Sequence, residues 1–198
     1  MVKETVYDMV FDAQAHFRVL LDAMARPGSI RVLNDVDIVP PQGLHRVSAL
    51  VGFALLNGDV TFHVVSDGSE VADYLMVNTA SSVVSADEAD FIFVKGHLPT
   101  PAILAAKVGS LRYPEEGATV IVEVEKISDV AFEGGVALTL SGPGVLDTKT
   151  IYVAGLDVAI LADFVSQNME FPMGIDMILT DGEDALSCVP RTAKLNWK

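Results

Sequence analysis

Five polar residues in this sequence are candidates for binding an anion or one another: Arg18, Arg26, Asp176, Arg191 and Thr192. Asp176 is the one carboxylate in an otherwise apolar run, and a carboxylate in a half-buried strand needs a partner. Arg191 and Thr192 follow Pro190, where a second apolar run ends. Two interpretations stay open. Backbone donors satisfy Asp176 while Arg191 binds loop carbonyls, or the two residues form a charge pair or an anion site.

The two apolar runs, Ile175 to Thr180 and Ala185 to Val189, predict a β-hairpin, because an acidic turn that contains a glycine separates them. Pro190 cannot donate a ladder hydrogen bond, so it ends the second strand. A turn at about residues 182–183 sets Asp176 opposite about Val189, two residues from Arg191. We therefore expect Asp176 and Arg191 to hold one another across the hairpin or through the adjoining loop.

A helix is predicted from Asp8 or Asp12, either of which can cap it, to about Ala25, where Pro27-Gly28 stops it. Spacings of three and four predict one inward apolar face, made of Phe17, Leu20, Leu21 and Met24.

Charged residues recur every four positions along this helix, at Arg18, Asp22 and Arg26. The simplest interpretation is a solvated row of ion pairs, each worth a few tenths of a kcal/mol. The alternative is that Arg18 and Arg26 converge with Arg191 on a phosphate or phosphonate, as in an enzyme with an arginine-lined anion site.

Predicted helices alternate with short apolar strands in the first half of the chain, and strands cluster in the second half. Further helices are predicted over about residues 44–56, 70–78, 101–107 and 157–165. Further strands are predicted over about residues 29–33, 60–65, 83–84, 91–94, 119–124, 136–140 and 151–153. This order predicts one α/β domain over residues 1–198, a three-layer α/β/α sandwich on a mixed sheet.

Composition limits the function classes. The chain is 51% hydrophobic with a mean hydropathy of +0.41, which indicates a large core or interface and excludes disorder. A net charge of −14 argues against nucleic acid and anionic lipid as partners. No apolar run approaches the roughly 18 residues of a membrane helix, and no signal-peptide core is present. The lone Cys188 fits a reducing compartment, so we expect a cytoplasmic protein.

The familiar catalytic signatures are absent, so we predict no catalytic residue, metal ligand or cofactor site. The histidines lack ligand spacing along the chain, and a metal site assembled in space stays an alternative: His16, His45, His63 and His97. Gly142-Pro143-Gly144 is interpreted as a structural turn rather than a dinucleotide loop, because Pro143 removes an amide and Asp147 replaces the third glycine. Glu115-Glu116 is interpreted as a solvated turn.

Several short motifs in a fixed order resemble one family, the H subunit of the bacterial carbon–phosphorus lyase system, which breaks down phosphonates. The motifs are Phe17-Arg18, Asp22-Ala23-Met24-Ala25-Arg26-Pro27-Gly28, Tyr113-Pro114-Glu115-Glu116-Gly117-Ala118-Thr119, Leu140-Ser141-Gly142-Pro143-Gly144, Phe171-Pro172-Met173-Gly174-Ile175-Asp176 and Pro190-Arg191-Thr192. The resemblance extends from about Asp8 to Leu195. Ala193 departs from it, because a second threonine is expected there.

The resemblance implies a fold similar to the large domain of pyridoxal-phosphate-dependent transferases, but without that cofactor. The sequence agrees, since no recognisable Schiff-base context surrounds Lys95, Lys107, Lys126, Lys149 or Lys194. The resemblance also implies a core complex with the G, I and J subunits, and a homodimer when the chain is isolated.

In that family the H subunit, with the G, I and L subunits, supports transfer of the phosphonate to the ribose of a nucleoside triphosphate. Radical cleavage of the C–P bond belongs to the J subunit with its iron–sulfur cluster, which a lone Cys188 could not hold. The alternative function is a stand-alone phosphonate- or phosphate-ester-processing enzyme.

Overall fold

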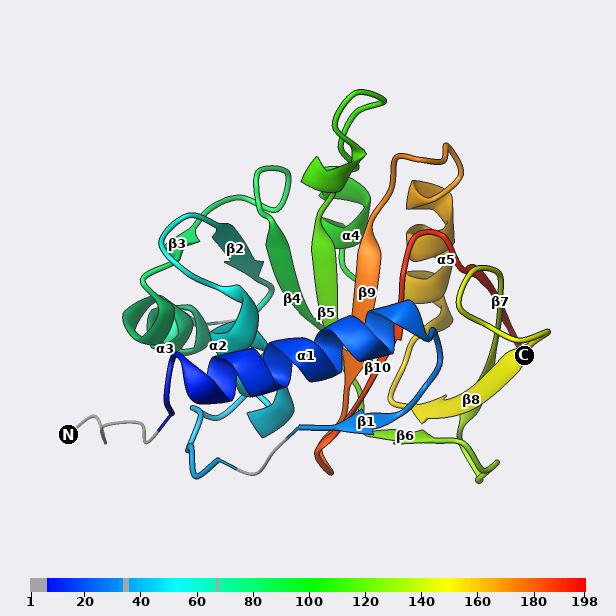
Figure 1. Ribbon diagram of the computed structural model, residues 1–198, viewed down its shortest axis with the longest axis horizontal. Coiled ribbons are helices and arrows are strands. Elements are labelled where there is room, and N and C mark those ends of the chain that lie inside the picture. The colour runs from blue at the N-terminus through cyan, green and yellow to red at the C-terminus, as the bar shows by residue number, and fades with distance from the viewer. Residues whose placement is uncertain (1–6, 34–35, 67) are drawn as a thin grey trace.

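A seven-stranded mixed sheet forms the centre of the molecule (Figure 1). The computed structural model describes residues 7–33, 36–66 and 68–198. The strand order is β1-β10-β9-β5-β4-β2-β3. The bounds are β1 (Arg31–Val32), β2 (Thr61–Val64), β3 (Ser82–Val83), β4 (Phe91–Lys95), β5 (Thr119–Glu123), β9 (Asp176–Thr180) and β10 (Ala185–Val189). Strands β3, β2, β4, β5 and β9 are parallel, whereas β10 and β1 are antiparallel to their neighbours.

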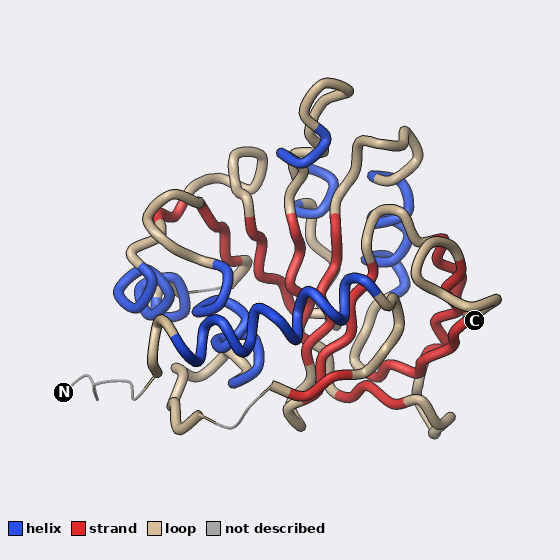
Figure 2. The backbone as a smooth tube through the Cα atoms, viewed as in Figure 1, coloured by secondary structure: helices blue, strands red, loops and turns tan. Residues whose placement is uncertain are grey.

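Both faces of the sheet are covered. Helices α1 (Phe11–Ala25), α2 (Arg46–Leu55) and α3 (Glu70–Thr79) pack on one face, and α1 crosses in front of the strands (Figure 2). The other face packs against α4 (Ala102–Ala105), α5 (Val158–Gln167) and a second, antiparallel sheet of order β11-β7-β8-β6. The strands of that sheet are β6 (Lys126–Ser128), β7 (Val136–Ser141), β8 (Lys149–Ala154) and β11 (Lys194–Trp197).

Alternation along the central strands divides the core. In β5, Ile121 packs with the first group of helices, whereas Val120 and Val122 pack with the helices and sheet on the other face. Successive side chains of a strand point to opposite faces, so a continuous apolar run indicates burial on both sides. The runs in β4, β5 and β9 show this pattern.

The predicted α/β class with a mixed sheet is confirmed, and parallel strands do precede hairpins. The second covering layer differs from the prediction, because a four-stranded sheet shares it with two helices. Two of its strands were not predicted. Each is short and buries one apolar side chain, Ile127 in β6 and Leu195 in β11, which is too little periodicity to detect.

The predicted inward face of α1 is partly wrong. The helix buries His16, Leu20 and Ala23, while Phe17 is 47% exposed and Leu21 59% exposed. The sequence carries two neighbouring apolar stripes, and only the one with the small Ala23 lies against the core. Val10 is the N-cap residue of α1 and makes no side-chain cap bond, but the Asp8 carboxylate accepts hydrogen bonds from the amides of Val10 and Phe11, at 2.8 and 3.0 Å, at the entry to the helix.

No helix in the described part of the chain is long and apolar enough to cross a bilayer.

Candidate functional site

Asp176 and Arg191 form an ion pair at the start of β9. The Arg191 Nη2–Asp176 Oδ2 distance is 2.6 Å, and the Arg191 backbone N–H donates to Asp176 Oδ1 at 2.7 Å. The side chains are 13% and 22% exposed, respectively. Met177 pairs with Val189, so the register places Asp176 one residue beyond the predicted position. The expected contact across the hairpin is present in the structure.

Arg191 also joins a third segment of the chain. Its guanidinium donates to the carbonyl oxygens of Pro114, at 2.5 Å, and Gly117, at 3.4 Å. Contacts from both interpretations drawn from the sequence are therefore present, because Arg191 pairs with the Asp176 carboxylate and also binds loop carbonyls. Every guanidinium nitrogen is engaged within the protein, which favours a structural role over ligand binding.

Two glycines allow the segments around Arg191 to meet. A Cβ on Gly117 would lie 2.1 Å from the carbonyl oxygen of Gly174. Any other residue at position 117 would therefore push the two segments apart. Gly174 has φ +147°, a conformation that L side chains rarely adopt. The motifs 113–119, 171–176 and 190–192, distant in the sequence, therefore form one cluster, which we call the Arg191 cluster.

The Arg191 cluster lies at the amino ends of the parallel strands β5 and β9. In open α/β sheets, ligands bind outside the carboxyl ends of the strands. Glu115 and Glu116 lie beside it in a 3₁₀ turn, Pro114–Glu116, and both are exposed, as predicted. The position and the satisfied hydrogen bonds both indicate that this cluster fastens the hairpin to the loop before β5.

Thr192 is exposed and lies beside Arg191 at a cavity of about 470 Å³. Most of the side chains around this cavity are apolar, including Phe164, Met169 and Phe171. The threonine hydroxyl makes no hydrogen bond to another residue that the structure describes. The cavity is more suitable for an apolar group than for an anion.

Arg18 and Arg26 lie away from the Arg191 cluster. Arg26 pairs with Asp22 at 2.7 Å, as the i,i+4 spacing predicts, and lines a different cavity from Arg191. Arg18 is exposed and makes no ion pair among residues 7–33, 36–66 and 68–198. The three arginines therefore do not converge on one anion, and the five candidate residues divide between two places.

The end of α1 meets the loop between β7 and β8. Gly142-Pro143-Gly144 forms the turn after β7, where the Val145 N–H donates to the Gly142 carbonyl at 3.1 Å. The interpretation of this segment as a structural turn is confirmed. A Cβ on Gly144 would lie 2.3 Å from the carbonyl oxygen of Ala25, so the motifs 22–28 and 140–144 are in direct contact.

A cleft at the carboxyl ends of the strands was missed by the sequence analysis. Lys95, at the end of β4, donates to the Glu123 carboxylate at the end of β5 and to the Gly43 carbonyl. Glu123 is 4% exposed and also accepts the His45 backbone N–H at 2.6 Å. The sequence does carry a signal for this site, since Lys95 and Glu123 are each the first charged residue after an apolar strand run. Their pairing depends on strand order, which no local pattern contains.

This cleft has a volume of about 660 Å³ and lies between β2 and β4. Helix α3 follows β2 on one face of the sheet and α4 follows β4 on the other, so this is the point where the strand order reverses, the usual ligand site of open α/β sheets. Glu70 also lines the cleft, and the Lys95 ammonium in its wall is already paired with the Glu123 carboxylate behind it. The cleft can bind a polar group, but it does not attract an anion.

No thiolate nucleophile is available at neutral pH. Burial raises the pKa of the Cys188 thiol, and the nearby Asp176 carboxylate raises it further. In the described part of the chain, no group of three or more His, Cys, Asp or Glu side chains is placed to hold a metal ion. His16 instead contacts the Tyr7 hydroxyl at 3.2 Å in the core.

Comparison with known proteins identifies relatives over almost the whole chain. The family model described as bacterial phosphonate metabolism protein (PhnH) matches residues 5–196. The α-D-ribose 1-methylphosphonate 5-triphosphate synthase subunit PhnH of Rhizobium meliloti (strain 1021) is 34% identical over 191 residues, covering 95% of this chain and 92% of that protein. The putative C-P lyase subunit protein HtxG of Stutzerimonas stutzeri is 31% identical over 185 residues, covering 93% and 86%.

Proposed function

This chain belongs to the PhnH family of bacterial phosphonate metabolism proteins, and on that premise we propose that it is a subunit of a carbon–phosphorus lyase complex. Within that complex we propose that it supports transfer of a phosphonate to the ribose of a nucleoside triphosphate. The name of the Rhizobium meliloti relative, a subunit of an α-D-ribose 1-methylphosphonate 5-triphosphate synthase, supports this proposal. Its partners are the G, I and J subunits, and it works in the cytoplasm.

The observation that supports an auxiliary role is that Arg191 is fully hydrogen-bonded within the protein. The candidate arginine with the greatest burial is saturated by Asp176, Pro114 and Gly117, so it is not free to bind a substrate. Cys188, the thiol of the chain, is buried and protonated. A self-contained active site needs a nucleophile or base with a free partner, and the Arg191 cluster offers neither.

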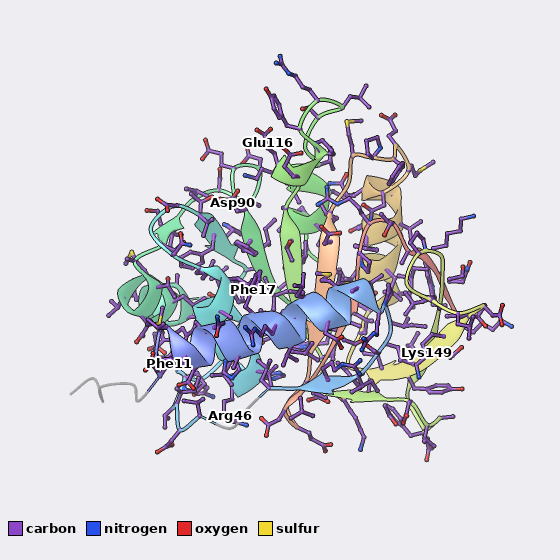
Figure 3. All side chains as sticks on the ribbon, viewed as in Figure 1. Phe11, Phe17, Arg46, Asp90, Glu116 and Lys149 are labelled. Carbon is purple, nitrogen blue, oxygen red and sulfur yellow. The ribbon has the colours of Figure 1, made fainter. Side chains whose placement is uncertain are left out.

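We also propose that the isolated chain forms a homodimer through the outer face of α1. Val10, Phe11, Phe17 and Leu21 are exposed on or beside this helix. Figure 3 labels Phe11 and Phe17 on it. Residues 11–26 carry two carboxylates and two guanidinium groups, whereas the whole chain has a net charge of −14. Like-charge repulsion between two acidic copies is therefore weaker here than elsewhere on the surface, and burial of the apolar stripe stabilises the pair.

We further propose that the fold is similar to the large domain of pyridoxal-phosphate-dependent transferases and that the chain does not bind their cofactor. Lys95 is the lysine at the carboxyl ends of the central strands, where such a cofactor would be bound. Its ammonium group is held by Glu123 and the Gly43 carbonyl. An imine forms through the lysine nitrogen, and this nitrogen is engaged by two acceptors within the protein.

The subunit role is tested by genetic complementation. A bacterium that lacks its own H subunit but keeps the other lyase genes is given this chain, with methylphosphonate as the sole phosphorus source. Restored growth is expected. No growth, from a chain that is expressed and folded, would refute the proposed function.

The alternative, a stand-alone phosphonate- or phosphate-ester-processing enzyme, predicts turnover by the purified chain alone. The separation of Arg26 from Arg191 weighs against it, because the site expected for it, in which Arg18, Arg26 and Arg191 converge, is not assembled. The same purified protein, incubated with methylphosphonate or a phosphate ester, distinguishes the two functions.

A further inference from the structure

We propose that a cavity between the end of α1 and the β7–β8 loop, here called the corner cavity, binds the oxyanion group of a phosphonate or phosphate. The inference rests on the proposed role in phosphonate metabolism and assigns it a binding site. The corner cavity has a volume of about 380 Å³, and its lining includes Arg26, Ser29, Arg31, Asp129 and Lys149. Lys149 lies at the start of β8, at the end of the molecule where α1 ends (Figure 3).

One carboxylate holds two of the three cations in place. Asp22 Oδ1 pairs with Arg26 Nη1 at 2.7 Å, and Asp22 Oδ2 pairs with Arg31 Nε at 2.8 Å. A single negative charge therefore fixes two guanidinium groups side by side, and one positive charge stays uncompensated. Several N–H groups of both arginines are left for another acceptor, because Arg31 otherwise donates to the Ile30 carbonyl alone.

Lys149 adds a third cation. Its ammonium group makes no hydrogen bond or ion pair with the residues that the structure describes. Asp129 also lines the cavity, so the two carboxylates, Asp22 and Asp129, face three cations. The chain has 13 Lys and Arg residues against 27 Asp and Glu, so a local excess of positive charge is unusual for it. The local excess is one positive charge, and an oxyanion is the ligand that offsets it.

The walls of the corner cavity are held together by glycines. A Cβ on Gly28 would lie 2.6 Å from Leu140 Cδ1 and 3.0 Å from Lys149 Cγ, so the stem of Lys149 crosses directly over the turn that follows Arg26. Gly28 has φ +76° and Gly144 has φ +80°, both in the left-handed region. The two turns can therefore meet and bring Lys149 beside the arginine pair.

A polar group in the wall has no partner within the protein. The hydroxyl of Ser29 is buried and makes no hydrogen bond to the described residues. Because this oxygen is itself shielded from solvent, the contacts to a ligand come from the guanidinium and ammonium groups of the cavity. Arginine forks match the geometry of phosphate oxygens, and lysine adds a compact charge. The combination selects a tetrahedral oxyanion rather than a neutral ligand.

The test is direct binding to the full-length chain. Titration with methylphosphonate and with inorganic phosphate, followed by calorimetry and by ³¹P NMR line broadening, is expected to give a Kd of about 1 mM or tighter. Affinity is expected to fall as salt rises, because charge carries the interaction.

Lys149→Gln and Arg26→Gln are each expected to weaken binding about tenfold, which corresponds to about 1.4 kcal/mol. Arg18→Gln is the matched control, since Arg18 lies on α1, the helix that ends just before Arg26, and lines none of the cavities described above. Circular dichroism confirms that the variants are folded. Absence of binding by the parent chain, or equal losses in all three variants, would overturn the assignment.

The outcome is separable from the proposed function. If the chain restores growth on methylphosphonate but does not bind either anion, the subunit role stands and the corner cavity is not a ligand site. If it binds both anions at the corner cavity but does not restore growth, the site stands and the subunit role fails.

Discussion

Removal of the Arg191 side chain is expected to be among the most destabilising single changes outside the apolar core. Arg191→Ala breaks the pair with Asp176 and leaves the Gly117 carbonyl without its side-chain donor, while the Pro114 carbonyl keeps the Gly117 N–H. Breaking a fully buried pair costs about 3–5 kcal/mol. Asp176 is 22% exposed and keeps the Arg191 backbone N–H, so the low end applies. We expect a loss of about 3 kcal/mol.

That loss corresponds to a fall in Tm of roughly 6–12 °C for a chain of this size. Urea unfolding followed by circular dichroism gives the free energy at 25 °C. Asp176→Ala should cost a similar amount, because it leaves the guanidinium without its counter-charge. The double variant should lose less than the sum of the two, by about 2 kcal/mol.

Arg18→Ala serves as the control, since this exposed arginine has no ion-pair partner in the described part of the chain. It should change stability by less than about 0.5 kcal/mol. Strict additivity of the Asp176 and Arg191 losses would show that the residues do not interact. That result would refute the structural role and leave Arg191 free for a ligand or a partner subunit.

Three further predictions follow from the geometry. Light scattering at micromolar concentration should show a dimer for the parent chain and a monomer for the double variant Phe17→Ser, Leu21→Ser. A monomeric parent would contradict the proposed α1 interface. Gly144→Ala should lower the free energy of unfolding in urea by about 1–3 kcal/mol more than Gly134→Ala does. Both glycines have positive φ, but an added Cβ lies 2.3 Å from a carbonyl oxygen at Gly144 and meets nothing at Gly134. Equal losses would exclude the close contact. Burial raises the pKa of Asp90, but hydrogen bonds from a neighbouring lysine and threonine outweigh it and hold the pKa below its usual value. The stability this carboxylate adds is complete above its unfolded pKa of about 3.9 and is lost as pH falls through the lower folded pKa, so Asp90→Asn should be less stable than the parent at pH 7 and approach it below about pH 4. A difference that does not depend on pH would contradict the assignment.

Local patterns predicted the hairpin well because its determinants are adjacent in the chain. The acidic turn, the two apolar runs and Pro190 define β9 and β10, and the register differs from the prediction by one residue. The contact between Asp176 and Arg191 followed from that register. Binding of loop carbonyls by Arg191 was one of the interpretations, but that the carbonyls are those of Pro114 and Gly117 could not be predicted, because this depends on the pairing of β5 with β9.

The errors have a common cause, which is that burial depends on tertiary contacts. Phe17 and Leu21 are as apolar as Leu20, yet only Leu20 reaches the core, because the small Ala23 sets which side of α1 packs closely. The corner cavity depends on Arg31, which no motif singled out, and on the contact of Gly144 with the end of α1. Lys95 and Glu123 meet because β4 and β5 are adjacent and in register.

Reconstitution from purified subunits tests the central claim most directly. The G, I and L subunits are mixed with a nucleoside triphosphate and methylphosphonate, with and without this chain, and the ribose phosphonate product is followed by ³¹P NMR. The account predicts product with the full set of subunits, and none from this chain alone. Product formed at the same rate without this chain, or by this chain alone, would contradict its role as an auxiliary subunit.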